Sequence, residues 1–150
     1  MRHSFRPAFA LIELIFVIVI IGVLASFAIP KFTGLSGNAK ISAELSTAAS
    51  VQVAIDACHG EWIINEGSFT CGGSIASSDL NSDGYPTTLG SATSPLGGIL
   101  KNAPTDWSVS GNNYTGPASG TNGTSTCKAG KPCIGKHWVY DNQQGTFALH

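Results

Sequence analysis

Residues 9–29 read FALIELIFVIVIIGVLASFAI, a run of 21 residues that contains a single charge, Glu13. As an α-helix this run would be about 31 Å long, close to the hydrocarbon thickness of a bilayer. Its many Ile and Val residues favour a strand in water. A single segment in a bilayer must satisfy its own backbone hydrogen bonds, however, and only a helix does so. The run therefore predicts a transmembrane helix over residues 9–29.

The alternative interpretation of this run is a secretory signal peptide. Such a peptide has a shorter apolar region, about 7–15 residues, that ends in a small-x-small cleavage site. The longer run and its early carboxylate favour the membrane helix. Arg2 and Arg6 precede the run without an acid, which favours a cytoplasmic N-terminus, although Lys31 and Lys40 weaken the contrast between the two sides.

Glu13 is the most informative residue in the chain. A charge at the middle of a membrane helix costs roughly 2.5–3.5 kcal/mol, and somewhat less near the helix end. An Ile at the same position would avoid this cost, so we expect the carboxylate to have a partner. The alternative is a carboxylate that snorkels to the lipid headgroups.

Arg6-Pro7-Ala8 followed by the residues 9–14, FALIEL, resembles the class III leader and N-terminus of type IV pilins and type II secretion pseudopilins. The resemblance implies that residues 1–8 are a leader and that a prepilin peptidase cuts between Ala8 and Phe9. Phe9 would then become the N-methylated first residue, and Glu13 would occupy the place of the family's special carboxylate. The family usually has Gly directly before the cut, where this chain has Ala8.

The resemblance also implies a partner for Glu13. The free amine of Phe9 would have an unperturbed pKa near ~8 and would be mostly protonated at neutral pH, and N-methylation leaves it able to carry charge. The N-H groups of the helix N-terminus also attract anions. The Glu13 carboxylate of a neighbouring subunit could then pair with this amine inside an apolar filament core and favour assembly in register.

The second half of the helix is predicted over residues 30–59. Pro30 removes one backbone donor, so we expect a kink or local melting there. An apolar face follows at helical spacing, formed by Ile41, Leu45, Ala48, Val51, Ile55 and Cys58, whereas Ser42, Glu44, Ser46 and Asp56 are assigned to the other faces. Gly60 suits a helix end.

Residues 60–150 predict a small globular, β-rich domain. Short β-favouring runs lie at 62–64, 107–109, 137–140 and 146–149, and the turn-forming segment 141–145 between the last two predicts a hairpin. Residues 108–130 are rich in Gly, Ser, Thr and Asn and are expected to be a surface loop. The predicted fold class is α+β: a long kinked N-terminal helix packed on an antiparallel sheet of three or four strands, which is also the architecture of pilins.

Four cysteines, Cys58, Cys71, Cys127 and Cys133, are expected outside the cytoplasmic membrane, where disulfides persist. Of the three possible pairings, Cys58–Cys71 and Cys127–Cys133 are favoured because both close short loops. A zinc site formed by Cys127, Cys133 and His137 is the alternative, but its spacing lacks a second pair of ligands.

Asp79, Asn81 and Asp83, followed by Gly84, match the D-x-N-x-D-G start of a calcium-binding loop, in which oxygens at alternate positions converge on Ca²⁺. The twelfth position of such a loop carries an acid, whereas this chain has Gly90. The alternative is a turn rich in Asn, Asp and Gly that binds no metal. Calcium is the one cofactor that the sequence suggests.

Several classes of function are disfavoured. The net charge of −1 gives no electrostatic signal for bulk nucleic-acid binding, and the motifs of common enzyme classes are missing, so we expect no enzymatic activity. The expected role is a filament subunit, anchored in the bacterial inner membrane and then assembled with itself and other pilins by an inner-membrane platform. Type II secretion and a surface pilus for adhesion, motility or DNA uptake both remain open. A single-pass membrane-anchored binding module that does not polymerise is the alternative.

Overall fold

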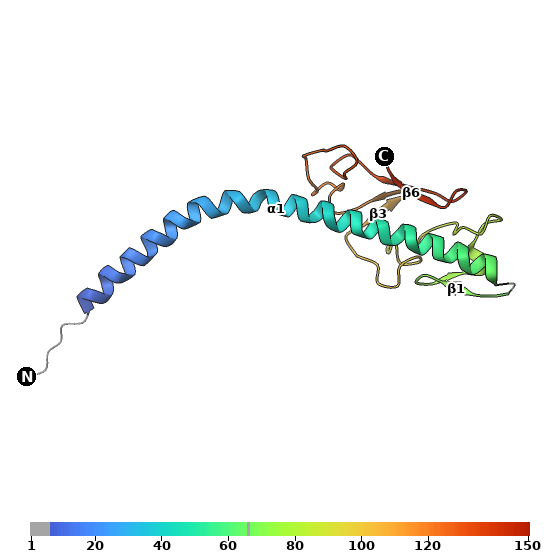
Figure 1. The fold of residues 1–150 in the computed structure, drawn as a ribbon, viewed down its shortest axis with the longest axis horizontal. Helices are drawn as coiled ribbons and strands as arrows, with labels where there is room; N and C mark the ends of the chain where they lie inside the picture. The colour runs from blue at the N-terminus through green and yellow to red at the C-terminus, as the bar shows by residue number, and fades with distance from the viewer. Residues whose placement is uncertain (1–6, 66) are drawn as a thin grey trace, which may run out of the picture. The chain divides into compact units, whose positions relative to one another are not determined.

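The structure, a computed structural model, describes residues 7–65 and 67–150, without the side chains of residues 7–10, 30 and 33. Most of the predicted leader and the side chains of Ala8 and Phe9 therefore lie outside the described part. The chain divides into two compact units, Met1–Ser36 and Gly37–His150. Helix α1 (Pro7–Ile64) is followed by short strands, so the α+β fold class is confirmed (Figure 1).

In the first unit, α1 contains the predicted membrane segment. Among the described residues, Leu11–Ile29 is the one helical stretch long and apolar enough to cross a membrane, and its large apolar side chains are exposed. The helix continues across Pro30, so the local melting expected there is not seen. A proline inside a helix removes a single donor, and the hydrogen bonds on either side keep the helical path. The kink expected at this position stays a prediction.

In the second unit, one stripe of α1 is buried. Its members recur at alternating steps of three and four residues: Ile41, Glu44, Ala48, Val51, Ile55 and Cys58. This spacing keeps them on one face of an α-helix. Leu45, which was assigned to the stripe, is only partly buried beside it. Glu44 was assigned to the exposed faces, and that prediction is wrong because its side chain is fully buried.

Helix α1 ends later than the sequence predicted, at Ile64 instead of near His59. Residues 62–64 were expected to form a strand, and they form the last turn of the helix instead. Gly60 disfavours helix by only about 1 kcal/mol, which local contacts can offset. The Trp62 ring stacks on His59, and Asn65 donates from both its backbone and its side chain to the carbonyl of Glu61 at 3.0 and 2.9 Å, which closes the helix end.

The second unit contains a four-stranded antiparallel sheet in the order β3-β4-β5-β6, formed by β3 (Ser108–Ser110), β4 (Asn113–Thr115), β5 (Trp138–Asp141) and β6 (Thr146–Leu149). The predicted hairpin is confirmed, since Asp141 pairs with Thr146 across the turn between β5 and β6. The loop predicted over 108–130 is wrong in part, because both β3 and β4 lie within it. Tyr114 on β4 is buried and pairs with Trp138 on β5, and this packing outweighs the polar sequence around it.

A smaller hairpin precedes the sheet. Strand β1 (Thr70–Cys71) pairs with β2 (Ile75–Ala76), and the 3-10 helix η1 (Ser77–Asp79) follows directly. Gly72 in the connecting turn has φ +61°, and a Cβ there would lie 2.4 Å from the carbonyl oxygen of Ile99. Glycine is therefore required at this turn by both its backbone conformation and the close approach of a neighbouring segment.

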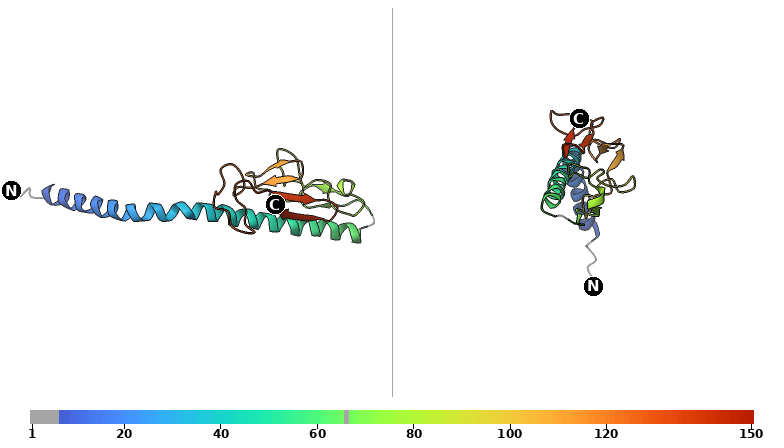
Figure 2. Two further views of the ribbon diagram at one scale, coloured as in Figure 1. Left: turned by 90° about the horizontal axis from the view of Figure 1, so that it is seen from above. Right: turned by 90° about the vertical axis from the view of Figure 1, so that its right-hand side faces the viewer.

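The core lies between the second half of α1 and the sheet. The strands lie along one side of this part of the helix (Figure 2). Val51 and Ile55 from the helix belong to one buried cluster with the aromatic residues of the sheet, where the Trp138 and Phe147 rings stack with centroids 5.4 Å apart. The packing of helix on sheet that the sequence predicted is thus confirmed.

Two disulfides close short loops, in the pairing that loop length favoured. Cys58 near the end of α1 is bonded to Cys71 of β1, and Cys127 is bonded to Cys133. The first bond is buried in the core cluster and joins the helix to the small hairpin. The second lies in the segment that precedes β5. Because both of its cysteines are bonded to each other, Cys127 and Cys133 cannot serve as the zinc ligands of the alternative hypothesis.

Candidate assembly site

Glu13 projects from an apolar part of α1. Its carboxylate is exposed, and the residues around it on the helix, Ile12, Leu14, Phe16 and Val17, expose large apolar side chains. A carboxylate in such a setting keeps its hydration in water but loses it in a bilayer or in an apolar helix bundle. A positive group brought close to this carboxylate in such an environment would therefore stabilise it.

The predicted processing residues, Ala8 and Phe9, lie one turn before Glu13. The backbone of Ala8 and Phe9 is helical, whereas their side chains are outside the described part. In one continuous helix, residues 9 and 13 are separated by four positions and lie on the same face. Cleavage before Phe9 would therefore place a new helix N-terminus, with its free N–H groups, next to the carboxylate along one face.

A second glutamate of the same helix has the opposite environment. Glu44 is 0% exposed, and its carboxylate accepts four hydrogen bonds. The backbone N–H groups of Ala118 and Ser119 donate to Oε2 at 2.7 and 3.0 Å. The Ser119 hydroxyl and the Trp138 indole N–H donate to Oε1 at 2.7 and 2.8 Å. Each oxygen thus accepts two hydrogen bonds, and the buried carboxyl group is satisfied by donors of its own unit.

The segment around Ser119 is shaped to receive Glu44. Gly116 approaches so closely that a Cβ there would lie 2.6 Å from the Glu44 carboxyl carbon. The Ser119 hydroxyl accepts the N–H of Gly116 at 3.0 Å, so it is both donor and acceptor in the same network. One turn earlier in α1, Lys40 donates to the carbonyl of Asn122. Lys40 and Glu44 together attach the loop between β4 and β5 to the helix.

The sequence contained a signal for this buried glutamate. Position 44 lies three residues after Ile41 and four before Ala48, so it belongs to the buried stripe by spacing. Its polarity led to assignment on the exposed faces instead. The donors that make burial possible lie 74, 75 and 94 positions away along the chain, and no local pattern predicts them.

Gln52 is a further residue that the sequence did not single out. Its side-chain oxygen accepts the N–H of Phe147 at 2.9 Å, and its side-chain nitrogen donates to the carbonyl of Gly145 at 2.9 Å. An amide that accepts an N–H of an edge strand and donates to the carbonyl directly before that strand imitates the bonding of a neighbouring strand. Gln52 thereby covers part of the open edge of β6, an edge that would otherwise attract another chain.

The residues of the calcium hypothesis form a turn in this structure. The side-chain oxygen of Asn81 accepts the N–H groups of Asp83 and Tyr85 at 3.0 and 2.9 Å, while its nitrogen donates to the carbonyl of Asn142. Asp79 accepts the N–H of Ala76 at 3.1 Å. The central oxygen of the expected ligand set is therefore occupied by backbone donors. This hydrogen bonding fits the Asx-turn alternative, and calcium binding by Asp79, Asn81 and Asp83 stays a prediction.

Comparison with known proteins gives one partial similarity. No family model matches the chain, and no solved structure matches it. Three sequences of the type IV major fimbrial protein FimA of Dichelobacter nodosus are each 36% identical to it over 55 residues, which is 37% of this chain and 34–35% of theirs. The match therefore spans about a third of the length of these curated relatives. With an apolar N-terminal helix and a helix packed on an antiparallel sheet, the chain is pilin-like, related over part of its length to a type IV fimbrial subunit.

Proposed function

We propose that this chain is a non-enzymatic structural subunit that polymerises into a type IV pilus-like filament, for type II protein secretion or as a surface pilus. The observation that carries the proposal is Glu13, an exposed carboxylate on the apolar helical stretch Leu11–Ile29. A helix that serves only as an anchor gains nothing from a charge there, since the charge opposes insertion. A helix that leaves the bilayer and packs with other copies can use the charge.

The subunit is inserted in the inner membrane and cut by a prepilin peptidase between Ala8 and Phe9, and the new amine is methylated. In the filament, Glu13 of one subunit pairs with the amine of Phe9 in a neighbour. Each buried charge then compensates the other, whereas a monomer moved out of the bilayer has no such pair. An inner-membrane platform assembles the subunits into a periplasmic or cell-surface fibre. The partial similarity to a fimbrial protein supports this route.

The direct test replaces the carboxylate. Glu13→Leu is expected to leave membrane insertion intact and cleavage before Phe9 unaffected, but to leave processed monomer in the membrane with few filaments. Loss of one partner of a buried pair costs about 3–5 kcal/mol, more than a hundredfold in an assembly equilibrium. Glu13→Gln is expected to fail similarly because the amide has no charge.

A matched control lies in the same helix. The Ser26 hydroxyl donates to the carbonyl of Val23 at 2.7 Å, within its own helix. Ser26→Ala therefore removes a polar group from the apolar run without removing a partner of another subunit, and filament yield should stay at the wild-type level. Filaments at normal yield and rate with Glu13→Leu would refute the charge-pairing mechanism and favour the single-pass anchored binding module.

The processing step has its own measurement. Mass spectrometry of the N-terminal peptide from membrane or filament material is expected to show a chain that starts at Phe9 and carries one added methyl group. The substitution of Ala8 for the usual Gly makes Ala8→Gly informative, since cleavage should be as complete or more complete in that variant. An intact Met1, or a start after Ser26, would contradict the class III assignment.

A further inference from the structure

Charged residues are strongly segregated along the second unit. Residues 41–100 contain no Lys or Arg, although they include six acidic residues, and residues 107–140 contain no Asp or Glu, although they include three lysines. These three lysines are Lys128, Lys131 and Lys136, and each is exposed. Such a separation is unlike the mixture of both signs on an ordinary domain surface. It gives two regions of opposite charge within one unit.

The helical part of the second unit is the stretch of α1 from Gly37 to Ile64. The fold places the lysines near the beginning of this helical part. The carbonyl of Asn122 accepts from Lys40, and the carbonyl of Thr124 accepts the N–H of Ile134 at 2.9 Å. Thr124 also lies against the helix at Gly37. The disulfide loop that carries Lys128 and Lys131 is therefore held beside the first turns of this helical part. We refer to Lys40, Lys128, Lys131 and Lys136 as the basic end.

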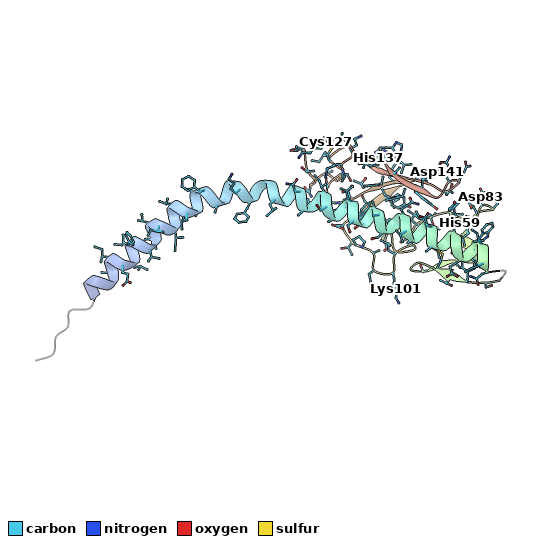
Figure 3. The ribbon with its side chains drawn as sticks, viewed as in Figure 1. His59, Asp83, Lys101, Cys127, His137 and Asp141 are labelled. Atoms are coloured by element: carbon cyan, nitrogen blue, oxygen red, sulfur yellow. A yellow bond between two sulfur atoms is a disulfide. The ribbon has the colours of Figure 1, made fainter. Side chains whose placement is uncertain are left out.

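The acidic residues gather at the other end of the same helical part. Asp56 and Glu61 are exposed on α1, and the turn with Asp79 and Asp83 lies beside them because Gly84 packs against the Trp62 ring. Figure 3 shows Cys127 at one end of this unit and Asp83 toward the other, near His59. We refer to the exposed carboxylates Asp56, Glu61, Asp79 and Asp83 as the acidic end. Asp141 lies nearby and is partly buried.

Other charges near the basic end reduce its net charge without cancelling it. Asp106 is exposed and shares a surface groove with Lys40, and Glu44 lies one turn along α1 but is fully buried. The lysines of the disulfide loop and Lys136 lie outside that groove. The exposed surface formed by residues 128–136 is therefore positive.

The two ends are too far apart to satisfy each other within one subunit. Lys40 and Glu61 are 21 residues apart on one helix, or about 31 Å at 1.5 Å per residue. This exceeds the Debye length of about 8 Å at physiological ionic strength. Each end is therefore free to interact with an oppositely charged surface elsewhere. A symmetric dimer that joined like ends would bring equal charges together, which is unfavourable.

We propose that the acidic end of one subunit docks on the basic end of another, so that copies of this chain join head to tail. Such a contact is heterologous and open-ended, the geometry that builds a filament rather than a closed dimer. The inference rests on the proposed filament function and assigns the second copy as the partner of the lysine-bearing disulfide loop. The pairs lie at an exposed rim, so they set register and rate of assembly more than total affinity.

Charge reversal and reciprocal rescue test the proposal in the full chain. The triple variant K128E/K131E/K136E and the double variant D79K/D83K are each expected to lower filament yield by about tenfold or more, because several weak pairs are replaced by repulsion. Combining both sets should restore yield to within about threefold of wild type. Lys101→Glu, outside both ends, should have little effect. The membrane level of processed subunit and the thermal unfolding of each variant verify that folding is unchanged.

The outcomes separate the two proposals. If wild-type filaments form and the combined variant is no better than either single set, the head-to-tail contact is refuted while the filament function stands. Loss of yield from the lysine changes alone, without rescue, would assign the basic end to another anionic partner, such as lipid or nucleic acid, and would also refute it. A wild-type chain that never forms filaments would overturn both proposals.

Discussion

Helix α1 carries two glutamates whose environments are opposite. Glu13 is exposed on an apolar stretch, whereas Glu44 is completely buried and accepts four hydrogen bonds from within its own unit. Both residues are carboxylates on apolar-looking stretches of one helix. They differ in the source of their hydrogen-bond donors. Glu44 receives its donors from the loop after β4 and from β5, whereas in the proposed filament Glu13 receives its partner from another subunit.

This comparison separates folding from assembly. A buried charge with a full set of donors contributes to the stability and uniqueness of the unit that contains it. A charge without a partner on an apolar surface raises the free energy of the monomer wherever water is excluded. A complex that supplies the partner is therefore favoured over the monomer. Substitutions of the two glutamates should therefore affect different measurements, and the following experiments use this difference, from the largest expected effect to the smallest.

The largest effect is expected for Glu44→Gln. An amide nitrogen at the Oε2 position would face two backbone N–H groups. At the Oε1 position it would face the Trp138 indole N–H, whereas the Ser119 hydroxyl can turn to accept from it. At least one hydrogen bond to a charged group is therefore lost, and the free energy of unfolding should fall by about 3 kcal/mol. All three tryptophans, Trp62, Trp107 and Trp138, lie in the second unit, so tryptophan fluorescence in urea measures this loss. Glu13→Gln should change the same curve by less than about 0.5 kcal/mol while preventing assembly. Equal urea unfolding curves for Glu44→Gln and Glu13→Gln would contradict the separate roles of the two glutamates in folding and assembly.

Gly116→Ala adds a methyl group to the tightly packed Glu44 site. The new Cβ would lie 2.6 Å from the Glu44 carboxyl carbon and Oε2, a separation that requires the loop or the helix to move. Such overpacking should lower the free energy of unfolding by about 2 kcal/mol. Gly60→Ala is the matched control, since nothing lies within 4 Å of its Cβ position on α1, and it should stabilise by up to about 1 kcal/mol. A stable Gly116→Ala protein would show that the site tolerates displacement.

Alkaline pH should unfold the second unit selectively. Burial raises the pKa of Tyr114, and burial with the nearby Tyr114 and Asp141 raises the pKa of Tyr140, whose hydroxyl donates to the carbonyl of Pro86 at 2.7 Å. These groups stay neutral in the folded state while an unfolded tyrosine ionises near pH ~10. The contribution of these two tyrosines to the free energy of unfolding is therefore fully present below about pH 10. Above that pH the free energy of unfolding falls, by up to about 1.4 kcal/mol per pH unit for each tyrosine.

Circular dichroism between pH 9 and 12 tests this expectation. The near-ultraviolet signal of the second unit should be lost first, while helical signal from Leu11–Ile29, a stretch without tyrosine, is retained. Tyr140→Phe removes one of the two ionising groups. Between pH 7 and pH 12 its free energy of unfolding should therefore fall by less than that of the wild type. An unchanged signal up to pH 12 would contradict the role of the two phenols.

The smallest effect is expected for Ser119→Ala. The change removes one donor to Glu44 Oε1 and the acceptor of the Gly116 N–H, and leaves the other three hydrogen bonds to the carboxylate in place. A loss of about 1 kcal/mol in the free energy of unfolding is expected. Ser110→Ala, at an exposed position on β3, should stay within a few tenths of 1 kcal/mol of wild type. Equal effects would mean that Glu44 is held by the backbone donors alone.

The sequence by itself determined the features that depend on local patterns. The apolar run at 9–29, with Glu13 as its one charge, predicts a helix because no other single segment satisfies its backbone in a bilayer. The alternating spacing from Ile41 to Cys58 predicts the buried face, the short loops predict the disulfide pairing, and residues 141–145 predict the β5–β6 hairpin. Each of these conclusions needs only residues that are close together in the chain. Glu13 belongs with them, since its neighbours alone make its charge conspicuous.

Only the tertiary structure decided the environment of Glu44, the presence of β4, the end of α1 at Ile64 and the turn at Asn81. In each case the decisive partner is distant: Trp138 for Glu44, the neighbouring β5 for Tyr114, Gly84 for Trp62, and Asn142 for Asn81. From sequence alone a polar residue is predicted to be exposed. The free-energy cost of burying it depends on hydrogen bonds to distant residues, which the sequence pattern does not show. The same reason separates the two glutamates. Both are glutamates, but among the described residues the fold brings hydrogen-bond donors only to Glu44.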